Sequence, residues 1–207
     1  IAVVVGDDTA DKLIAKLKPL IAQLRVGPGL QQGGEENEMG PLVSSAHQKK
    51  VLGYIDLGVE EGATLVADGR NYQVPGYPEG YYVGGTLFDH VKPNMRIYRE
   101  EIFGPVACLL PFKSEEDGLR MANDVEYGLA SYIWTQDVSK VLRLARGIEA
   151  GMVFVNTQNV RDLRQPFGGV KASGTGREGG EYSFEVFAEM KNVCISMGDH
   201  PIPKWGV

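Results

Sequence analysis

The 207-residue sequence is poor in the side chains from which metal sites and disulfide frameworks are built. Its two cysteines, Cys108 and Cys194, lie far apart, and its three histidines are scattered without a cysteine or histidine at ligand spacing. Each cysteine lies in an apolar stretch, which predicts two buried, reduced thiols rather than a disulfide. We therefore expect no metal site in this chain.

Long apolar runs and basic clusters are also missing. No run approaches the ~20 apolar residues that a membrane-spanning helix needs, and the first residues lack the basic region of a signal peptide. The net charge of −6, without a cluster of Lys or Arg, would repel nucleic acid. We expect a cytoplasmic protein with neither a nucleic-acid nor a membrane partner.

Several catalytic motifs do not occur. The sequence has no Gly-x-Ser-x-Gly elbow, no His-Glu-x-x-His pair and no phosphate-binding Gly-x-x-x-x-Gly-Lys-Ser/Thr loop. Residues 174–179 do match Gly-x-Gly-x-x-Gly, but that fingerprint needs a complete βαβ unit around it, and too little chain remains to build one. We interpret these glycines as part of a close-packed loop.

What is present is a regular alternation of short apolar runs with helical patterns. With 43% hydrophobic residues, a chain of this size buries roughly 70% of its unfolded surface, so we expect one substantial core. The predicted strands cover residues 2–5, 63–66, 82–83 with 86–88, 106–112, 129–135, 152–156 and 191–197. The predicted helices begin at Asp8 or Thr9, at Ser44 or Ser45, at Ser114 and at Asp137.

The order of these elements predicts the fold. From residue 106 to residue 156 strands and helices alternate as in βαβ units, so we expect an α/β fold with a mostly parallel open sheet and flanking helices. The helix from Asp137 should turn its apolar residues inward, namely Val138, Val141, Leu142, Ala145 and Ile148. After it we expect a loop at 157–181, a short amphipathic piece at 182–187, a strand at 191–197 that pairs with another subunit, and an extended tail at 201–205.

Two stretches carry chemistry. Residues 100–106 read Glu-Glu-Ile-Phe-Gly-Pro-Val, which sets two carboxylates and an aromatic ring at the mouth of a buried strand. A charged loop that merely leads into the strand is the alternative. Arg161 and Arg164 follow the carboxyl end of another strand, where open α/β sheets place their ligands, and could bind a substrate carboxylate. The alternative there is an Arg-Asp-Arg surface network.

Residues 100–106, together with 166–174 and 176–178, resemble the motifs of the aldehyde dehydrogenase superfamily. Residues 40–43, 51–55 and 61–63 occur in the order that this family uses, so the resemblance covers essentially the whole chain. It implies an aldehyde dehydrogenase catalytic domain at residues 1–181 and a C-terminal oligomerisation segment at residues 182–207.

The resemblance also implies an activity and a cofactor site. Enzymes of this family oxidise aldehydes to acids with NAD or NADP, through a cysteine nucleophile. Glu101 matches the residue that binds the nicotinamide ribose, and Phe103 matches the aromatic residue beside the nicotinamide. Lys50 and His47 fall where the family contacts the adenine-side ribose, and His47 replaces the usual Gln.

The substrate side is implied in the same way. Phe167 and the loop at 157–165 match the substrate entrance, and Arg161 replaces an aromatic residue of many members. This pattern resembles members that oxidise a carboxylated semialdehyde in aromatic-acid breakdown, whereas residues 68–70 and 76–82 resemble a CoA-acylating branch.

The nucleophile is the part that the resemblance does not supply. Neither Cys108 nor Cys194 matches the family's nucleophilic cysteine, which lies just upstream of the first strand of this chain. The chain is therefore expected to contain no catalytic residue and to be inactive alone. We also expect it to form a homodimer or homotetramer through its C-terminal strand. A purely structural or assembly module is the remaining alternative.

Overall fold

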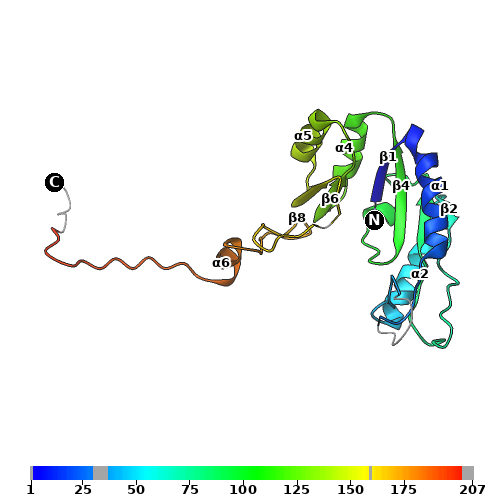
Figure 1. Ribbon diagram of the computed structural model, residues 1–207, viewed down its shortest axis with the longest axis horizontal. Helices are drawn as coiled ribbons and strands as arrows, with labels where there is room; N and C mark the ends of the chain where they lie inside the picture. The colour runs from blue at the N-terminus through cyan, green and yellow to red at the C-terminus, as the bar shows by residue number, and fades with distance from the viewer. Residues whose placement is uncertain (1, 30–36, 159, 202–207) are drawn as a thin grey trace.

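The computed structural model describes residues 2–29, 37–158 and 160–201. Figure 1 shows a sheet with α1 and α2, then a smaller layer with α4, α5 and β6, then an extended C-terminal segment that leads away from both. The helices are α1 (Asp7–Gln23), α2 (Ser45–Glu60), α3 (Arg96–Arg99), α4 (Glu115–Asn123), α5 (Val138–Gly147) and α6 (Tyr182–Phe187). The strands are β1 (Ala2–Gly6), β2 (Thr64–Ala67), β3 (Thr86–Asp89), β4 (Val106–Phe112), β5 (Tyr127–Gly128), β6 (Ala130–Ile133), β7 (Met152–Val155) and β8 (Val170–Lys171).

The main sheet has the strand order β1-β4-β3-β2. β1 and β3 run parallel to β4 on its two sides, and β2 runs antiparallel to β3. In this register Val3 lies opposite Leu109, and Leu87 lies opposite Ala107. The sheet is therefore mostly parallel, as predicted, with β4 at an inner position. The predicted strand at 82–83 is not formed, and β3 begins at Thr86.

The core lies on both faces of this sheet. Successive side chains of a strand point to opposite faces, so Leu87 and Leu109 pack with α1 while Phe88 and Leu110 pack with α2. All four side chains are fully buried, and each contributes roughly 1.5–3 kcal/mol through the loss of apolar surface from water. This continuous burial explains why 106–112 reads as an unbroken apolar run.

Three helices begin at the predicted caps. The hydroxyl oxygens of Ser44 and Ser114 and the carboxylate of Asp137 each accept a backbone N–H from the first turn of α2, α4 and α5. The prediction for α1 was wrong, because the helix begins at Asp7 with Gly6 as its N-cap and without a side-chain cap bond. β1 runs directly into α1 there, which leaves no loop residue to serve as a cap.

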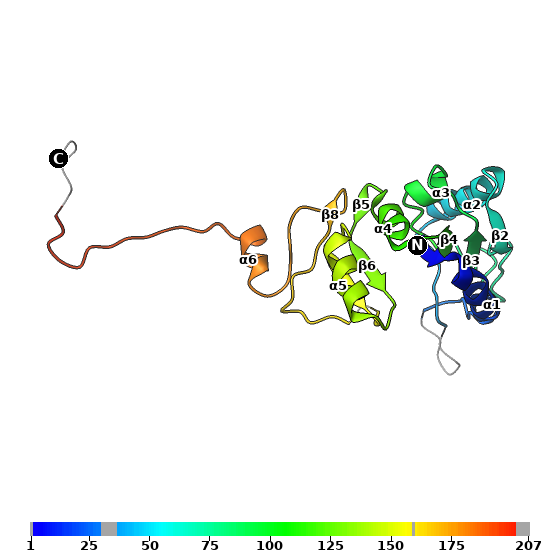
Figure 2. The ribbon, with the colours of Figure 1, turned by 90° about the horizontal axis from the view of Figure 1, so that it is seen from above.

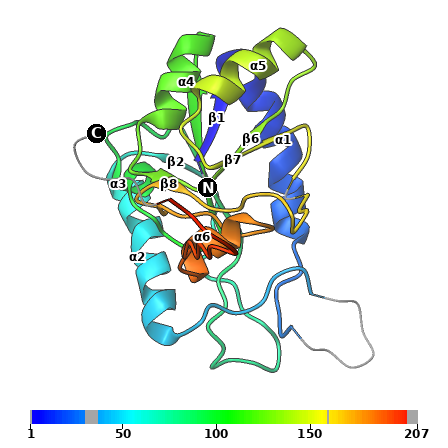
Figure 3. The same cartoon turned by 90° about the vertical axis from the view of Figure 1, so that its left-hand side faces the viewer.

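The smaller layer contains a complete βαβ unit. β6 and β7 are parallel, joined through α5, with Ala130 opposite Met152 and Ile133 opposite Val155. They form a separate two-stranded sheet and do not extend the main one. β5 and β8 form a second small sheet, antiparallel, which ties the loop after β7 to this layer. α4 and α5 lie side by side (Figures 1 and 3), joined by Arg143 Nε and Glu115 Oε1 at 2.8 Å.

The apolar face of α5 is more open than predicted. Val138 is 71% exposed and Leu142 is 54% exposed, and no residue of the helix is fully buried. The prediction that these two residues point inward was therefore wrong. The helix packs on β6, its residues Val141, Leu144 and Ala145 are half-buried, and Val138 and Leu142 stay largely exposed in the described part of the chain.

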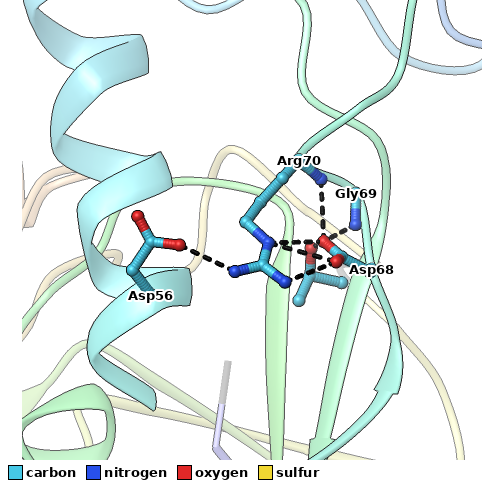
Figure 4. Close-up of polar contacts among 5 residues, drawn as sticks. Asp56, Asp68, Gly69 and Arg70 are labelled. Atoms are coloured by element: carbon cyan, nitrogen blue, oxygen red, sulfur yellow. Dashed lines mark hydrogen bonds and ion pairs between the residues drawn. The ribbon is translucent and has the colours of Figure 1, made fainter. Parts of the chain in front are cut away.

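The loop after β2 is tied back to α2 by Arg70 (Figure 4). Its guanidinium binds Asp56 of α2 through Nη1 at 2.7 Å and Asp68 through Nε and Nη2 at 2.9 and 2.6 Å. These contacts raise the pKa of Arg70, and the hydrogen bond from Arg70 lowers the pKa of Asp68. Gly69 lies so close to Gly84 that a Cβ would come 2.0 Å from its carbonyl oxygen, so only glycine fits there.

The C-terminal segment departs most from the predictions. Residues 188–201 form neither helix nor strand and extend away from the domain (Figures 1 and 2), so the strand predicted at 191–197 is not formed in the single chain. Cys194 is exposed there, and the prediction that it is buried was wrong. An isolated strand lacks a partner for its backbone groups, which explains both results. The predicted tail at 201–205 lies outside the described residues beyond Pro201.

Candidate functional site

In the segment 100–106, Ile102 is buried and the side chains on either side of it are exposed to solvent. Ile102 is 7% exposed and belongs to the same core cluster as Val51 and Ile55 of α2. Its neighbours Glu101 and Phe103 are exposed, Phe103 by 74%. Phe103 has a φ of 58°, a left-handed conformation that is uncommon for an aromatic residue. A carboxylate and an aromatic ring are therefore displayed together on one surface.

The first turns of α2 hold this segment through its main chain. Nε2 of His47 lies 2.7 Å from the carbonyl oxygen of Phe103, and Nζ of Lys50 donates to the carbonyl oxygen of Glu101 at 2.9 Å. The rings of His47 and Phe103 also meet edge to face, with centroids 6.0 Å apart. The structure thus brings together all four residues that were predicted to bind the cofactor.

Glu100 has a structural role beside them. Its carboxylate accepts hydrogen bonds from Arg96 Nε at 2.7 Å and from the Tyr54 hydroxyl at 2.5 Å. The bonds from Arg96 and from Tyr54 lower the pKa of Glu100 to about 2, so the group is ionised at neutral pH. Glu100 therefore links α2 to α3, whereas the Glu101 carboxylate has no hydrogen bond or ion pair within the described ranges.

Sequence reasoning missed Tyr54 and Arg96. The signal for Tyr54 was its spacing, because His47, Lys50 and Tyr54 lie at positions i, i+3 and i+7 and so share one face of α2. For Arg96 the signal was its distance of four residues from Glu100, which is the spacing of a helical ion pair.

A second group of residues surrounds a recess of about 550 Å³ between β7, the loop after it and α6. The central guanidinium carbon of Arg161 lies over the Phe167 ring, 4.0 Å from its centroid, which is a cation–π contact. Both side chains line the recess, together with apolar residues of β7 and α6 such as Met152, Phe154 and Phe187. The recess therefore combines an apolar wall with a polar part that includes the Arg161 guanidinium and the side chains of Asp162 and Glu178.

Arg161 and Arg164 have different partners. Arg164 binds Asp162 through Nε at 2.9 Å and Nη2 at 2.5 Å, which lowers the pKa of Asp162. Arg161 has no hydrogen bond or ion pair to another residue in the parts of the chain that are described. The surface network that was the alternative for this loop thus involves Asp162 and Arg164, and Arg161 takes no part in it.

The Gly-rich stretch fixes the shape of this loop. Phe167 and Glu178 exchange backbone hydrogen bonds of 2.7 and 2.8 Å. Gly179 has a φ of 100°, and a Cβ there would lie 2.2 Å from the carbonyl oxygen of Gln165. No helix begins until α6, so these glycines pack a loop, as predicted.

Neither cysteine has the surroundings of a nucleophile. Cys108 is buried in β4, where burial raises the pKa of its thiol to about 11, and Sγ donates to the Ile97 carbonyl oxygen at 3.6 Å. Cys194 lies on the extended C-terminal segment. Within the described ranges no three His, Cys, Asp or Glu side chains gather as a metal site, and no helix is long and apolar enough to cross a membrane.

The fold and these motifs define the class of protein. The model of the aldehyde dehydrogenase family matches residues 2–193, and the chain belongs to that family. It is 65% identical over 149 residues to 5-carboxymethyl-2-hydroxymuconate semialdehyde dehydrogenase from Escherichia coli, covering 70% of this chain and 32% of that protein. It is 49% identical over 174 residues to malonate-semialdehyde dehydrogenase from Pseudomonas aeruginosa, covering 84% of this chain and 34% of that protein.

A solved structure extends this likeness. The NAD+ complex of an aldehyde dehydrogenase from Bacillus cereus superposes with a TM-score of 0.86 at 38% identity, over 95% of this chain and 39% of that one. The α/β fold with a mostly parallel sheet is thus that of the family. The chain spans about a third of the length of the curated relatives it matches.

Proposed function

We propose that this chain forms part of the cofactor and substrate walls of an NAD(P)-dependent aldehyde dehydrogenase that oxidises a carboxylated semialdehyde to the acid. The observation that carries the proposal is the state of Arg161. Its guanidinium lines the recess 4.0 Å from the Phe167 ring and makes no hydrogen bond or ion pair among the described residues, although Asp162 and Glu178 line the same recess. A substrate with a second carboxylate would supply that partner through charge-assisted hydrogen bonds.

The contact with Phe167 supports recognition of a carboxylate. The five N–H groups of a guanidinium lie in its own plane, so a ring over the guanidinium carbon leaves donors for a carboxylate. Arg161 can therefore bind a carboxylate in bidentate fashion while Phe167 restricts its rotamers. Pre-organisation of this kind lowers the entropy lost on binding.

The cofactor surface fits the nicotinamide half of a dinucleotide. The Glu101 carboxylate has no partner in the described ranges, so it can accept hydrogen bonds from both hydroxyls of a ribose. The exposed Phe103 ring offers an apolar face beside it. When bound, the cofactor accepts the hydride from the substrate. We propose NAD because the Bacillus cereus neighbour is an NAD+ complex, and NADP is the alternative.

We further propose that the chain has no activity alone. Its two thiols are unsuited to attack an aldehyde, one because it is buried and protonated and the other because it lies on a segment that extends from the domain. Residues 1–181 would contribute the catalytic-domain part and residues 182–207 the oligomerisation segment. The buried, reduced Cys108 is consistent with the cytoplasmic address expected from the sequence.

The CoA-acylating alternative rests on residues 68–70 and 76–82 and on the malonate-semialdehyde relative. Arg70, the one cation in these stretches, is bound by Asp56 and Asp68 and is therefore not available to a CoA phosphate. We rank this alternative second. It predicts that product release requires CoA.

The test is an assay of NADH or NADPH formation by the complete polypeptide that contains this chain and by the 207-residue chain itself. Succinic semialdehyde serves as the carboxylated substrate and butanal as the neutral one. We expect turnover by the complete polypeptide without CoA, a preference for succinic semialdehyde, and no turnover by the isolated chain. Turnover by the isolated chain, or an absolute requirement for CoA, would contradict the corresponding part of the proposal.

A further inference from the structure

Phe103 is held between two fixed points of the main chain. On one side Ile102 is buried in the core next to α2. On the other side Gly104 lies so close to α2 that an added Cβ would come 2.6 Å from Val51 Cγ2. Between these anchors Phe103 takes its φ of 58° and projects its ring into solvent. A left-handed conformation of an aromatic residue persists only when its surroundings impose it.

The group that meets Phe103 at this point is His47. The backbone N–H of His47 donates to Ser44 Oγ at 3.2 Å, which places the residue in the capped first turn of α2. Its Nε2 lies 2.7 Å from the carbonyl oxygen of Phe103. A carbonyl oxygen only accepts hydrogen bonds, so Nε2 carries the proton in the neutral ring as well as in the cation. The bond therefore does not depend on the charge of the imidazole.

Lys50 repeats this contact one turn further along α2. Nζ donates to the carbonyl oxygen of Glu101 at 2.9 Å. Two donors on one helix face thus bind the carbonyl groups of alternate residues of the segment. The side chains of Glu101 and Phe103 are left free for a ligand.

We propose that His47 is a positioning residue, which acts on the cofactor surface through the main chain of Phe103. Its Nε2–H binds the Phe103 carbonyl oxygen and so holds that residue in the left-handed conformation that displays its ring. The family resemblance implied a direct contact between His47 and a ribose, but here the Nε2 hydrogen is already engaged. The effect of His47 on cofactor binding rests on the proposed function. The effect of His47 on the conformation of Phe103 is independent of that function.

Proteolysis of the 207-residue chain tests the positioning without any cofactor. Chymotrypsin cleaves after exposed aromatic residues, and native-state cleavage reports how often the local structure opens. Cleavage after Phe103, measured by mass spectrometry, is compared with cleavage after Phe187, which is 76% exposed and lies far along the chain in α6. Phe187 serves as an internal reference in every sample.

Four variants separate the hydrogen bond from packing. His47→Gln keeps a donor at the same reach, His47→Phe keeps a ring against Phe103 without a donor, and His47→Ala removes both. Lys49→Ala is the matched control, because Lys49 is exposed on the same helix and has no hydrogen bond or ion pair to residues 101–103 in the described structure. The thermal unfolding midpoint of each variant shows whether global stability has changed.

We expect His47→Phe and His47→Ala to raise the Phe103-to-Phe187 cleavage ratio roughly three- to tenfold, as expected for loss of one hydrogen bond. The cleavage ratios of His47→Gln and Lys49→Ala should stay within about twofold of the ratio of the parent chain, because neither substitution removes the hydrogen bond to Phe103. Equal ratios in all variants, or a ratio in His47→Gln as high as in His47→Ala, would overturn the proposal. If His47→Ala does not fold, the comparison of His47→Gln with His47→Phe decides.

A second measurement separates this inference from the proposed function. The dissociation constant of NAD+ is measured by calorimetry for the complete polypeptide and its His47 variants. The proposal predicts weaker binding in His47→Phe than in His47→Gln, by the same three- to tenfold as in the cleavage ratio. If the parent polypeptide does not bind NAD+, the proposed function fails, while the cleavage ratios still decide the positioning role. Equal NAD+ affinities in Gln and Phe variants would overturn the link to the cofactor surface.

Discussion

The hydroxyl of Tyr54 donates to the carboxylate of Glu100 over 2.5 Å, and so connects α2 to the segment that displays Glu101 and Phe103. Arg96 binds the same carboxylate from α3, at 2.7 and 3.0 Å. The two donors fix Glu100, and the direction in which the following residues leave α3 is fixed with it. Of two adjacent glutamates that look equivalent in the sequence, Glu100 is bound by Arg96 and Tyr54, and Glu101 is exposed to solvent.

Glu100 gives the site a dependence on pH. Its pKa is lowered from an ordinary 4.5 to about 2, so its contribution to folding is complete above pH 4.5 and is lost as the pH falls towards 2. Because the carboxylate is 40% exposed, we expect Glu100→Gln to lower the free energy of unfolding by only about 0.5–1 kcal/mol at pH 7.

Urea denaturation at pH 7 and at stepwise lower pH measures this difference. The gap between the parent chain and Glu100→Gln should narrow as the pH falls from 4.5 to about 2. Glu60→Gln is the control, since Glu60 is exposed at the end of α2 and has no ion pair in the described part of the structure. A gap that is constant with pH would show that the ion pair does not contribute in this way.

The contacts of Arg70 with Asp56 and Asp68 predict a local effect on stability (Figure 4). The Arg70 side chain is 30% exposed and makes a bidentate contact, so Arg70→Leu should lower the free energy of unfolding by about 1 kcal/mol. The free energy of unfolding of Arg70→Lys should lie between those of the parent chain and Arg70→Leu, because an ammonium keeps the charge and loses the paired geometry.

Thermal or urea unfolding of the Arg70 variants checks this expectation. Arg146→Leu provides the control, as Arg146 is an exposed arginine of α5 for which the described residues supply no ion-pair partner. An Arg70→Leu chain as stable as Arg146→Leu would mean that the contacts in Figure 4 add nothing measurable.

The C-terminal segment predicts a strand that forms only in an assembly. Val193, Ile195 and Met197 are 68%, 72% and 94% exposed in the single chain, and in an extended strand they would share one face. If that face is buried against another subunit, Ile195→Asp in the complete polypeptide should shift the oligomer towards smaller species.

Light scattering coupled to size-exclusion chromatography measures the oligomer. Ser196→Asp is the matched control, because it adds the same charge one residue away, on the opposite face of the strand. If both variants dissociate the oligomer to the same extent, the added charge and not a buried face explains the effect. If neither variant dissociates the oligomer, this segment is not the interface.

Local signals in the sequence predicted most of the fold. Ser44, Ser114 and Asp137 were identified as caps because their side chains bond to backbone groups only a few residues away. The run at 106–112 predicted β4 to the residue, since a strand covered on both faces must be apolar throughout. The family motifs then predicted which exposed side chains bind the cofactor and the substrate.

What was missed depends on contacts that periodicity does not encode. The apolar pattern of α5 predicted a helix correctly, but whether Leu142 is covered depends on a partner surface and not on the pattern. Cys194 was judged by its apolar neighbours, although burial also needs a second element to pack against. The cation–π contact of Arg161 with Phe167 joins residues whose proximity is created by the shape of the loop.

The substrate class is tested most directly by the KM values of Arg161→Ala in the complete polypeptide. Loss of a charge-assisted hydrogen bond costs about 1.5–3 kcal/mol, so KM for succinic semialdehyde should rise roughly tenfold to a hundredfold while KM for butanal changes little. Arg164→Ala removes the same charge from a residue that is already bound to Asp162, so KM should change little for either substrate. An equal rise for both aldehydes in Arg161→Ala would contradict a role for Arg161 in binding the substrate carboxylate.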